Sequence, residues 1–199
     1  MSIEAAQREA VRRAVNELQS VDLAARCERL GLPIPNTEGL HFRAFGQNLV
    51  LRLPGYELVD ADNGQPAKLR DQILVLHYLR YQRSIHPTGD LISFRELPGG
   101  QFYWEAFCGR SIAPVLKRIG NDTELLKRHL GRFDWQPFES GDLGARIHGI
   151  GHLDAFLIYR RGDEECEPTA DVLFDRCIKQ VYAAEDAVVF ASRICLGLL

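Results

Sequence analysis

The chain has 199 residues, of which 46% are hydrophobic and 26% charged, and its formal net charge at pH 7 is −3. This composition is ordinary for a globular protein, and it excludes the basic footprint that nucleic-acid-binding proteins carry. No apolar run approaches the roughly 20 residues of a transmembrane helix, and the N-terminal sequence lacks the apolar core of a signal peptide. We therefore predict a cytoplasmic protein that contacts neither nucleic acid nor membrane, folded as a single domain over residues 1–199.

The first half of the chain changes from helical to strand patterns and back. Small apolar residues recur every four positions over 3–18 and predict a helix, and Ser20 is placed to cap a second helix over 21–30. Residues 40–60 read as a three-stranded antiparallel meander. Residues 68–84 are apolar almost all round, which predicts a helix buried on several sides.

Residues 91–107 predict the central element, a β-hairpin. Two runs of β-branched and aromatic residues flank the turn signal Leu-Pro-Gly-Gly. Each face of this hairpin would carry large aromatic rings together with ionisable groups, and Arg95 would lie beside Trp104 in a cation–π contact. The hairpin is then either covered on both sides with its charges paired, or an aromatic-walled pocket with Arg95, Glu96 and Tyr103 at its mouth.

The second half of the chain predicts further helices and strands in alternation. We expect short helices over 111–119 and 123–130, an aromatic connector over 133–138, strands over 145–150 and 153–159, and helices over 168–182 and 185–198. Helices at both ends, one buried helix and a mainly antiparallel sheet with a central hairpin together predict an α+β fold.

The five cysteines form no Cys-x-x-Cys pair. An odd count in a chain of this length without an export signal favours reduced thiols, and it gives no support for a structural zinc site. Cys27, Cys177 and Cys195 lie in apolar surroundings and are predicted to be small core residues.

Three histidines are candidate ligands. His77 lies in the buried helix, where it is either a core histidine with a satisfied hydrogen bond or a ligand-binding residue. His148 and His152 are separated by a Gly-Ile-Gly sequence that disfavours a helix. On one strand they would lie about 13 Å apart at about 3.3 Å per residue, too far for one metal, unless a tight glycine turn brings them together.

An acidic run is the densest charge feature of the sequence. Clustered carboxylates can bind a hard cation, and Asp163, Glu165 and Asp175 are the predicted metal ligands. The alternative is a solvated acidic loop followed by acids that favour helix N-termini. The spacing does not match an EF-hand, and the chain contains no P-loop, Gly-x-Gly-x-x-Gly, Gly-x-Ser-x-Gly or His-Glu-x-x-His motif.

Three stretches together resemble a known family. They are Gln-Ile-Leu-Val-Leu-His-Tyr-Leu at 72–79, Ile-Ser-Phe-Arg-Glu-Leu-Pro-Gly-Gly at 92–100, and the acids of 162–165 followed by 172–175 and 185–186. In order and spacing the chain is similar to the uncharacterised prokaryotic domain-of-unknown-function family 3786 over nearly its whole length.

The resemblance implies a setting and a shortlist of residues. It implies anaerobic bacteria and archaea, with some relatives fused to a four-cysteine iron–sulfur domain of the type found in corrinoid one-carbon proteins. This chain lacks that cysteine motif, so an iron–sulfur or corrinoid centre would have to come from a protein partner. The motif positions with chemical potential are Ser93, Arg95, Glu96, Asp163, Glu164, Glu165, Asp175, Glu185 and Asp186.

These observations lead to three hypotheses. The first is a cytoplasmic accessory or binding protein of anaerobic redox or corrinoid-linked one-carbon metabolism, which binds a cofactor or partner through Ser93, Arg95, Glu96, Tyr103, Trp104 and His77. The second is an enzyme that uses the acidic cluster for divalent metal binding or general acid–base chemistry. The third is an interaction subunit without small-molecule chemistry. The sequence identifies no substrate, cofactor or oligomeric state.

Overall fold

The computed structural model describes residues 3–199, and the chain divides into two compact units. The first unit runs to His86 and also includes Ile150–His152, and the second comprises Pro87–Gly149 and Leu153–Leu199. Helices accompany a three-stranded and a five-stranded antiparallel sheet, so the predicted α+β class is confirmed. The single-domain assignment stays a prediction.

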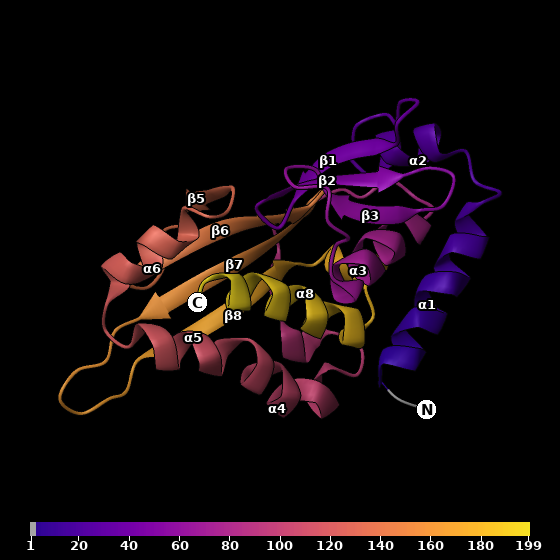
Figure 1. Cartoon of the computed structure of the whole chain (residues 1–199). Coiled ribbons are helices and arrows are strands. Elements are labelled where there is room, and N and C mark those ends of the chain that lie inside the picture. The colour runs from indigo at the N-terminus through magenta and orange to yellow at the C-terminus, as the bar shows by residue number, and fades with distance from the viewer. Residues whose placement is uncertain (1–2) are drawn as a thin grey trace. The chain divides into compact units, whose positions relative to one another are not determined.

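The first unit follows the sequence patterns closely (Figure 1). The predicted meander is confirmed as a sheet of order β1-β2-β3. The second helix is capped by Asp22, whose carboxylate accepts a hydrogen bond from the Ala25 N–H at 3.1 Å, and not by Ser20. The elements of this unit are α1 (Ile3–Leu18), α2 (Leu23–Arg29), β1 (Leu40–Ala44), β2 (Gln47–Arg52), β3 (Glu57–Asp60) and α3 (Leu69–Arg80).

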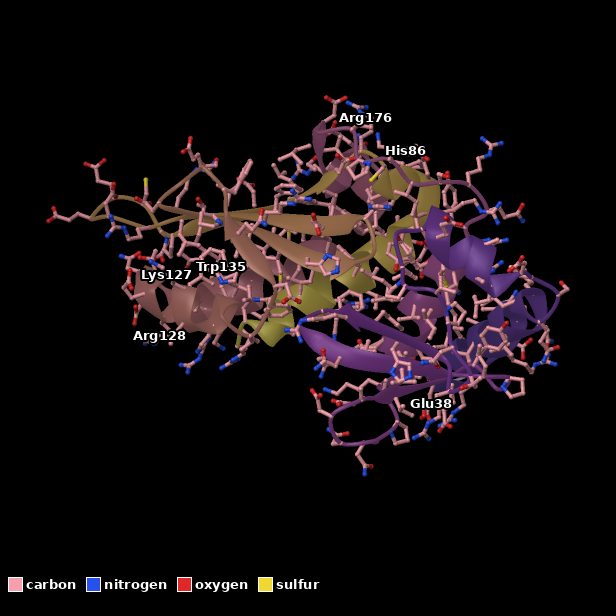
Figure 2. The ribbon with its side chains drawn as sticks, turned by 90° about the horizontal axis from the view of Figure 1, so that it is seen from above. Glu38, His86, Lys127, Arg128, Trp135 and Arg176 are labelled. Carbon is pink, nitrogen blue, oxygen red and sulfur yellow. The ribbon has the colours of Figure 1, made fainter. Side chains whose placement is uncertain are left out.

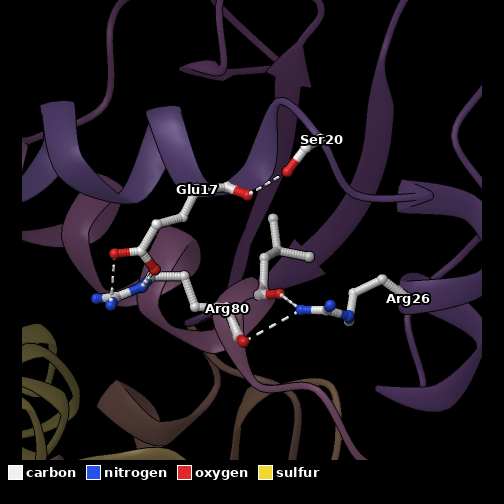
Figure 3. Close-up of polar contacts among 5 residues, drawn as sticks. Glu17, Ser20, Arg26 and Arg80 are labelled. Atoms are coloured by element: carbon white, nitrogen blue, oxygen red, sulfur yellow. Dashed lines mark hydrogen bonds and ion pairs between the residues drawn. The ribbon is translucent and has the colours of Figure 1, made fainter.

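Helix α3 is the buried helix that the sequence predicts. Most of its apolar side chains are buried, and its C-terminal end is held by two arginines (Figure 3). Arg26 donates from Nη1 to the carbonyl oxygens of Leu79 at 2.8 Å and Arg80 at 3.1 Å, which satisfies carbonyl groups at the C-terminal end of the helix. Arg80 in turn forms a two-point ion pair with Glu17 of α1, at 2.5 and 2.9 Å.

The second unit is built on the sheet of order β4-β8-β7-β6-β5. Figure 1 shows α8 lying along this sheet, with α4 and α5 beside it. The elements are β4 (Leu91–Ser93), the 3-10 helix η1 (Phe94–Glu96), α4 (Gly100–Arg110), α5 (Ile112–Ile119), α6 (Thr123–Leu130), β5 (Trp135–Pro137), β6 (Leu143–Ile150), β7 (Leu153–Arg160), β8 (Thr169–Asp175), α7 (Ile178–Val181) and α8 (Ala184–Gly197).

Strand β6 presents two different faces. Ile147 and Gly149 are buried, whereas Arg146 is exposed and His148 is half-buried. Side chains alternate across a strand, so the buried positions share one face and the polar positions share the other. A Cβ on Gly149 would collide with the ring of Phe190 of α8. The buried face therefore packs directly on α8, and we call the opposite face, with Arg146 and His148, the outer face.

The prediction of a hairpin over 91–107 is wrong. Only Leu91–Ser93 is a strand, and the chain then enters η1 and α4. Ser93 and Glu96 form a capping box, in which the Glu96 carboxylate accepts the Ser93 N–H at 2.7 Å and its hydroxyl at 3.1 Å. This local interaction stops the strand and starts a helical turn.

The glycines of the predicted turn begin a helix instead. Gly99 has φ +80°, and a Cβ on Gly100 would collide with the carbonyl oxygen of Phe94. Phe94 stacks on Phe107 with ring centroids 4.3 Å apart, and Phe107 contacts Phe174 of β8 edge-on at 6.3 Å. By composition the aromatic run could form a strand or a helix. The helix forms because it buries these rings against one another and against β8.

The helix predicted over 168–182 is also wrong in its first half. Residues 169–175 form β8, which lies between β4 and β7, and only Ile178–Val181 is helical. The burial of β8 alternates along Thr169–Phe174, as expected for a strand, and its register places Phe174 opposite Ala155 of β7. The aromatic connector at 133–138 likewise contains a short strand, β5.

Candidate functional site

A pocket of about 450 Å³ lies on the outer face of the second unit's sheet. Its lining comes from β5, from the residue before it, and from β6 and β7. Ligand sites in proteins are commonly concave and of about 300–1,000 Å³, with a few convergent polar groups. The lining residues are Asp134, Trp135, Gln136, Arg146, His148 and Asp154.

The carboxylate of Asp154 organises this pocket. Its Oδ2 accepts a hydrogen bond from Arg146 Nε at 2.5 Å, and its Oδ1 is 3.1 Å from His148 Nδ1. The Asp154 side chain is only 11% exposed, whereas those of Arg146 and His148 are 49% and 29% exposed. A well-shielded carboxylate thus holds two more accessible cationic or polar groups side by side.

Backbone pairing fixes the positions of these side chains. Gln136 of β5 is the register partner of Arg146, and the His148 N–H donates to the Asp134 carbonyl oxygen at 2.8 Å. With the other face of β6 packed on α8, Arg146 and His148 are directed to the outer face by strand alternation. The pocket is therefore built on regular sheet rather than on a loop.

The pocket lining combines the hydrogen-bond donors of Arg146 with the carboxylates of Asp134 and Asp154. A guanidinium group carries five N–H donors and no acceptor. Among the described residues, the structure gives Arg146 one hydrogen-bond acceptor, Asp154, which engages Nε and leaves the Nη groups available. Figure 2 shows Trp135 at the same end of the unit as Lys127 and Arg128 of α6, which add positive charge there. Arg146 thus offers this lining a fixed positive charge that can pair with an anion.

Comparison with known proteins identifies a family. The family model described as Domain of unknown function (DUF3786) matches residues 22–196. The chain belongs to this family. The resemblance drawn from the sequence is thereby confirmed. No curated protein and no solved structure matches the chain. Within residues 3–199, no helix is both long enough and apolar enough to cross a membrane.

Ser93 and Glu96, from one family motif, are engaged with each other. The Glu96 carboxylate accepts both hydrogen bonds of the capping box from Ser93. The backbone hydrogen bond from Ser93 is the main reason that the pKa of Glu96 lies below its ordinary value. The structure gives these two motif positions a local structural role.

Arg95 lies over the Trp104 ring, with its guanidinium carbon 4.2 Å from the ring centroid. The predicted contact therefore exists, although Trp104 lies on α4 and not across a hairpin. Tyr103 is hydrogen-bonded to Glu185 of α8, and this bond raises the pKa of Tyr103. Tyr103 and Glu185 line a depression of about 380 Å³ whose lining does not include Arg95 or Trp104. The structure thus divides these predicted ligand-binding residues between separate contacts.

His77, the remaining predicted ligand-binding residue, lies half-buried on α3. It belongs to the first unit, whereas the five other predicted ligand-binding residues belong to the second.

The predicted metal ligands serve different local structures. Asp163 accepts the N–H groups of Glu165 and Cys166 at 2.9 and 2.8 Å, which closes a loop turn before β8. Asp175, at the far end of β8, accepts N–H groups of Thr88, Gly89 and Cys177. The strand of seven residues separates Asp175 from the Asp163 loop. The structure does not bring Asp163, Glu165 and Asp175 together, and residues 3–199 contain no group of three or more His, Cys, Asp or Glu side chains placed to hold a metal ion.

His148 and His152 have different partners. The tight glycine turn that would bring them together is present, since Gly151 has φ +54° between β6 and β7. His148 nevertheless contacts Asp154, whereas the His152 N–H donates to the Tyr78 hydroxyl at 3.0 Å. The sequence therefore drew attention to His148 for a pairing that the structure does not use.

Sequence reasoning missed Arg146, Asp154 and the pocket. One signal was present: Arg146 and His148 are two residues apart on a predicted strand and so share a face, and Asp154 is the first polar residue of the next strand. Sequence alone did not show that this face is open while its opposite is packed on a helix.

Proposed function

We propose that this protein binds a small polar molecule through an anionic carboxylate or phosphate group, in the pocket lined by Arg146, His148 and Asp154. The single observation that carries the proposal is the Asp154 carboxylate, which holds the Arg146 guanidinium and the His148 ring together at the edge of a pocket of about 450 Å³.

The chemistry of arginine supports an anionic ligand. Guanidinium groups pair with carboxylates and phosphates through parallel N–H···O bonds, which are stronger than neutral hydrogen bonds. Asp154 fixes the Arg146 side chain through Nε, so less side-chain entropy is lost when an anion meets the Nη groups. Gln136 and Asp134 supply further polar groups for the rest of the ligand.

Calorimetric titration with succinate and with inorganic phosphate tests the proposal. We expect saturable binding of at least one probe to the wild-type protein and a loss of roughly 10-fold or more in affinity for Arg146→Ala, because a hydrogen bond to a charged group contributes about 1.5–3 kcal/mol. Arg160→Ala is the matched control, since Arg160 lies on the same sheet, is 47% exposed and pairs with Asp171 at 2.8 Å. Equal affinities of the two variants would contradict the proposal.

A cytoplasmic accessory role in anaerobic redox or corrinoid-linked one-carbon metabolism is retained as the biological setting of this binding function. It rests on the family resemblance and on the composition of the chain. The pocket geometry neither supports nor opposes a partner with an iron–sulfur or corrinoid centre. Affinity capture from an anaerobic native extract, followed by an absorption spectrum of the captured fraction, tests the partner.

The enzyme that uses the acidic cluster stays a prediction. Asp163 and Asp175 accept backbone hydrogen bonds, as described above, and an ion would have to compete with those donors. Titration with magnesium, manganese, calcium and zinc tests it directly. Stoichiometric heat that disappears in Asp163→Asn would support metal binding by the acidic cluster, and the absence of heat would contradict it.

A further inference from the structure

We propose that His148 is a proton-transfer residue, which exchanges a proton through Nε2 with an ionisable O–H or N–H group of a small anionic ligand held by Arg146. This inference rests on the proposed function, because the pocket must bind the ligand before His148 can act on it. It goes further by assigning the site a reaction step and its substrate a second chemical feature.

The hydrogen bond between His148 and Asp154 fixes which ring nitrogen carries the proton. An ionised carboxylate only accepts hydrogen bonds, so His148 Nδ1, 3.1 Å from Asp154 Oδ1, must be the donor. A neutral imidazole has one N–H, and its other nitrogen is then an acceptor. The geometry therefore leaves Nε2 with a lone pair, which is the state of a general base.

Asp154 is a positioning residue in this arrangement. Arg146 occupies its second oxygen at 2.5 Å, so the carboxylate cannot turn away from the ring without losing that ion pair. The charged groups around His148 are Arg146 on its own strand, Asp154 on β7 and Asp134 just before β5. Two carboxylates and one guanidinium leave a local charge that accommodates an imidazolium when a ligand anion is paired with Arg146.

The proton-transfer step balances without an external reagent. The O–H or N–H bond of the ligand breaks, its electron pair stays on the ligand atom, and a new N–H bond forms at His148 Nε2. The resulting imidazolium keeps its Nδ1–H donated to Asp154. Return of the proton from Nε2 to another atom of the ligand, or to water, restores the starting state.

His129 offers a comparison with His148. His129 is buried, and its Nδ1 lies 2.7 Å from the carbonyl oxygen of Leu198, near the end of α8. That contact fastens a helix end within the fold. His148 combines a carboxylate partner, partial exposure and a place in a pocket lining, and these features suit a general acid–base residue.

Long-range proton–nitrogen NMR of the histidine rings tests the assignment. At a pH where the His148 ring is neutral, we expect the wild-type protein to show the Nδ1–H tautomer. In Asp154→Asn the side chain has only one oxygen acceptor, so Arg146 and His148 compete for it. Because Arg146 can only donate, we expect it to take that oxygen, so that the amide N–H₂ faces Nδ1 and the ring switches to the Nε2–H tautomer. His129 should keep its tautomer in both proteins.

Acylation by diethyl pyrocarbonate gives a second readout of the same lone pair. We expect modification of wild-type His148 at Nε2, loss of that modification in Asp154→Asn, and protection of the wild-type ring by succinate or inorganic phosphate. A wild-type Nε2–H tautomer, or a tautomer unchanged in Asp154→Asn, would overturn the proton-transfer role while leaving anion binding intact. The expected tautomers without binding of either anion would instead overturn the proposed function, and the proton-transfer role with it.

Discussion

Two aspartates near one another in the sheet of the second unit use their carboxylates differently. Asp175 ends β8 and accepts hydrogen bonds from the backbone of Thr88, Gly89 and Cys177, together with the Thr88 hydroxyl at 3.1 Å. Asp154, on the neighbouring strand β7, accepts them from the side chains of Arg146 and His148. Both are largely shielded from solvent: Asp175 as a whole residue is 7% exposed, and the side chain of Asp154 is 11% exposed.

The two carboxylates differ in the kind of donor that they meet more than in burial or charge. A backbone N–H is fixed in the fold and has a single proton to donate. Once it is bonded to a carboxylate, it has no further site for a ligand. Side-chain donors such as Arg146 and His148 have other N–H or lone-pair sites left over. The carboxylate of Asp154 thus supports a pocket, whereas that of Asp175 closes a loop onto a strand.

The largest expected effect is on stability, in Asp175→Ala. The substitution leaves three backbone N–H groups without their acceptor, and each costs about 1 kcal/mol or more, so we expect a loss of about 3 kcal/mol in the free energy of unfolding. Urea denaturation measures it. Anion binding by the folded fraction should be unchanged, and a coupled loss of binding would break the distinction between the two aspartates.

The acid dependence of stability sharpens this comparison. Burial is the strongest single influence on Asp175 and raises its pKa, but the hydrogen bonds from Cys177, Thr88 and Gly89 together outweigh it, so the pKa is lowered. A lowered folded pKa means stability that is present above the unfolded value, about 3.9, and is lost as the pH falls through the folded value. The stability difference between wild type and Asp175→Asn should therefore shrink below about pH 4. A difference that stays constant to pH 2 would contradict the assignment.

Gly149→Ala tests the packed face of the strand behind the pocket. The added methyl group collides with the Phe190 ring, and overpacking of a core costs about 1–3 kcal/mol. Thermal unfolding measures this effect. Gly109→Ala is the control, because no atom lies within 4 Å of a Cβ placed there. Equal stability of the two variants would show that β6 is not held against α8 as described.

Asp154→Ala is expected to act mainly on binding. Without its partner, Arg146 loses its fixed position, and we expect roughly a 10-fold loss in affinity for succinate or phosphate, in the range of a charge-assisted hydrogen bond. Calorimetry measures the affinity, and Asp171→Ala, which removes the exposed partner of Arg160, is the control. Removal of a negative charge by itself favours anion binding, so an affinity that is unchanged or raised in Asp154→Ala would contradict the positioning role of Asp154.

The smallest expected effect lies in the capping box. Ser93→Ala removes a cap that contributes about 1 kcal/mol, and chemical denaturation should show a loss of that size without a change in anion binding. If Ser93→Ala instead weakened anion binding, the family motif at 92–100 would be part of the site.

Local patterns were sufficient to predict the first unit and the α+β class. Periodicity predicted α1, the meander and α3 because each of these elements has a regular apolar pattern. Local patterns failed at 91–107. Aromatic residues suit a strand and a helix equally there, and the burial of Phe94 and Phe107 determines that the helix forms. They failed again at β8, whose alternation is short and runs directly into a helical turn.

The pocket was beyond sequence reasoning for a different reason. Asp154 and His148 lie on adjacent strands, and their meeting depends on the tight turn at Gly151. The acidic loop has a high charge density, but the Asp163 carboxylate accepts hydrogen bonds from the neighbouring Glu165 and Cys166 N–H groups. Charge density can be read from the sequence, whereas the donors that a carboxylate meets depend on the fold.

The anion site is tested most directly by an NMR titration that follows the arginine Nε–H signals of the wild-type protein while succinate or inorganic phosphate is added. We predict saturable shifts at Arg146 and at backbone amides of β5, β6 and β7, with little change at Arg95 or Arg160. No shift at Arg146 with either anion, or equal shifts at all three arginines, would contradict the assignment of the pocket as a specific anion site.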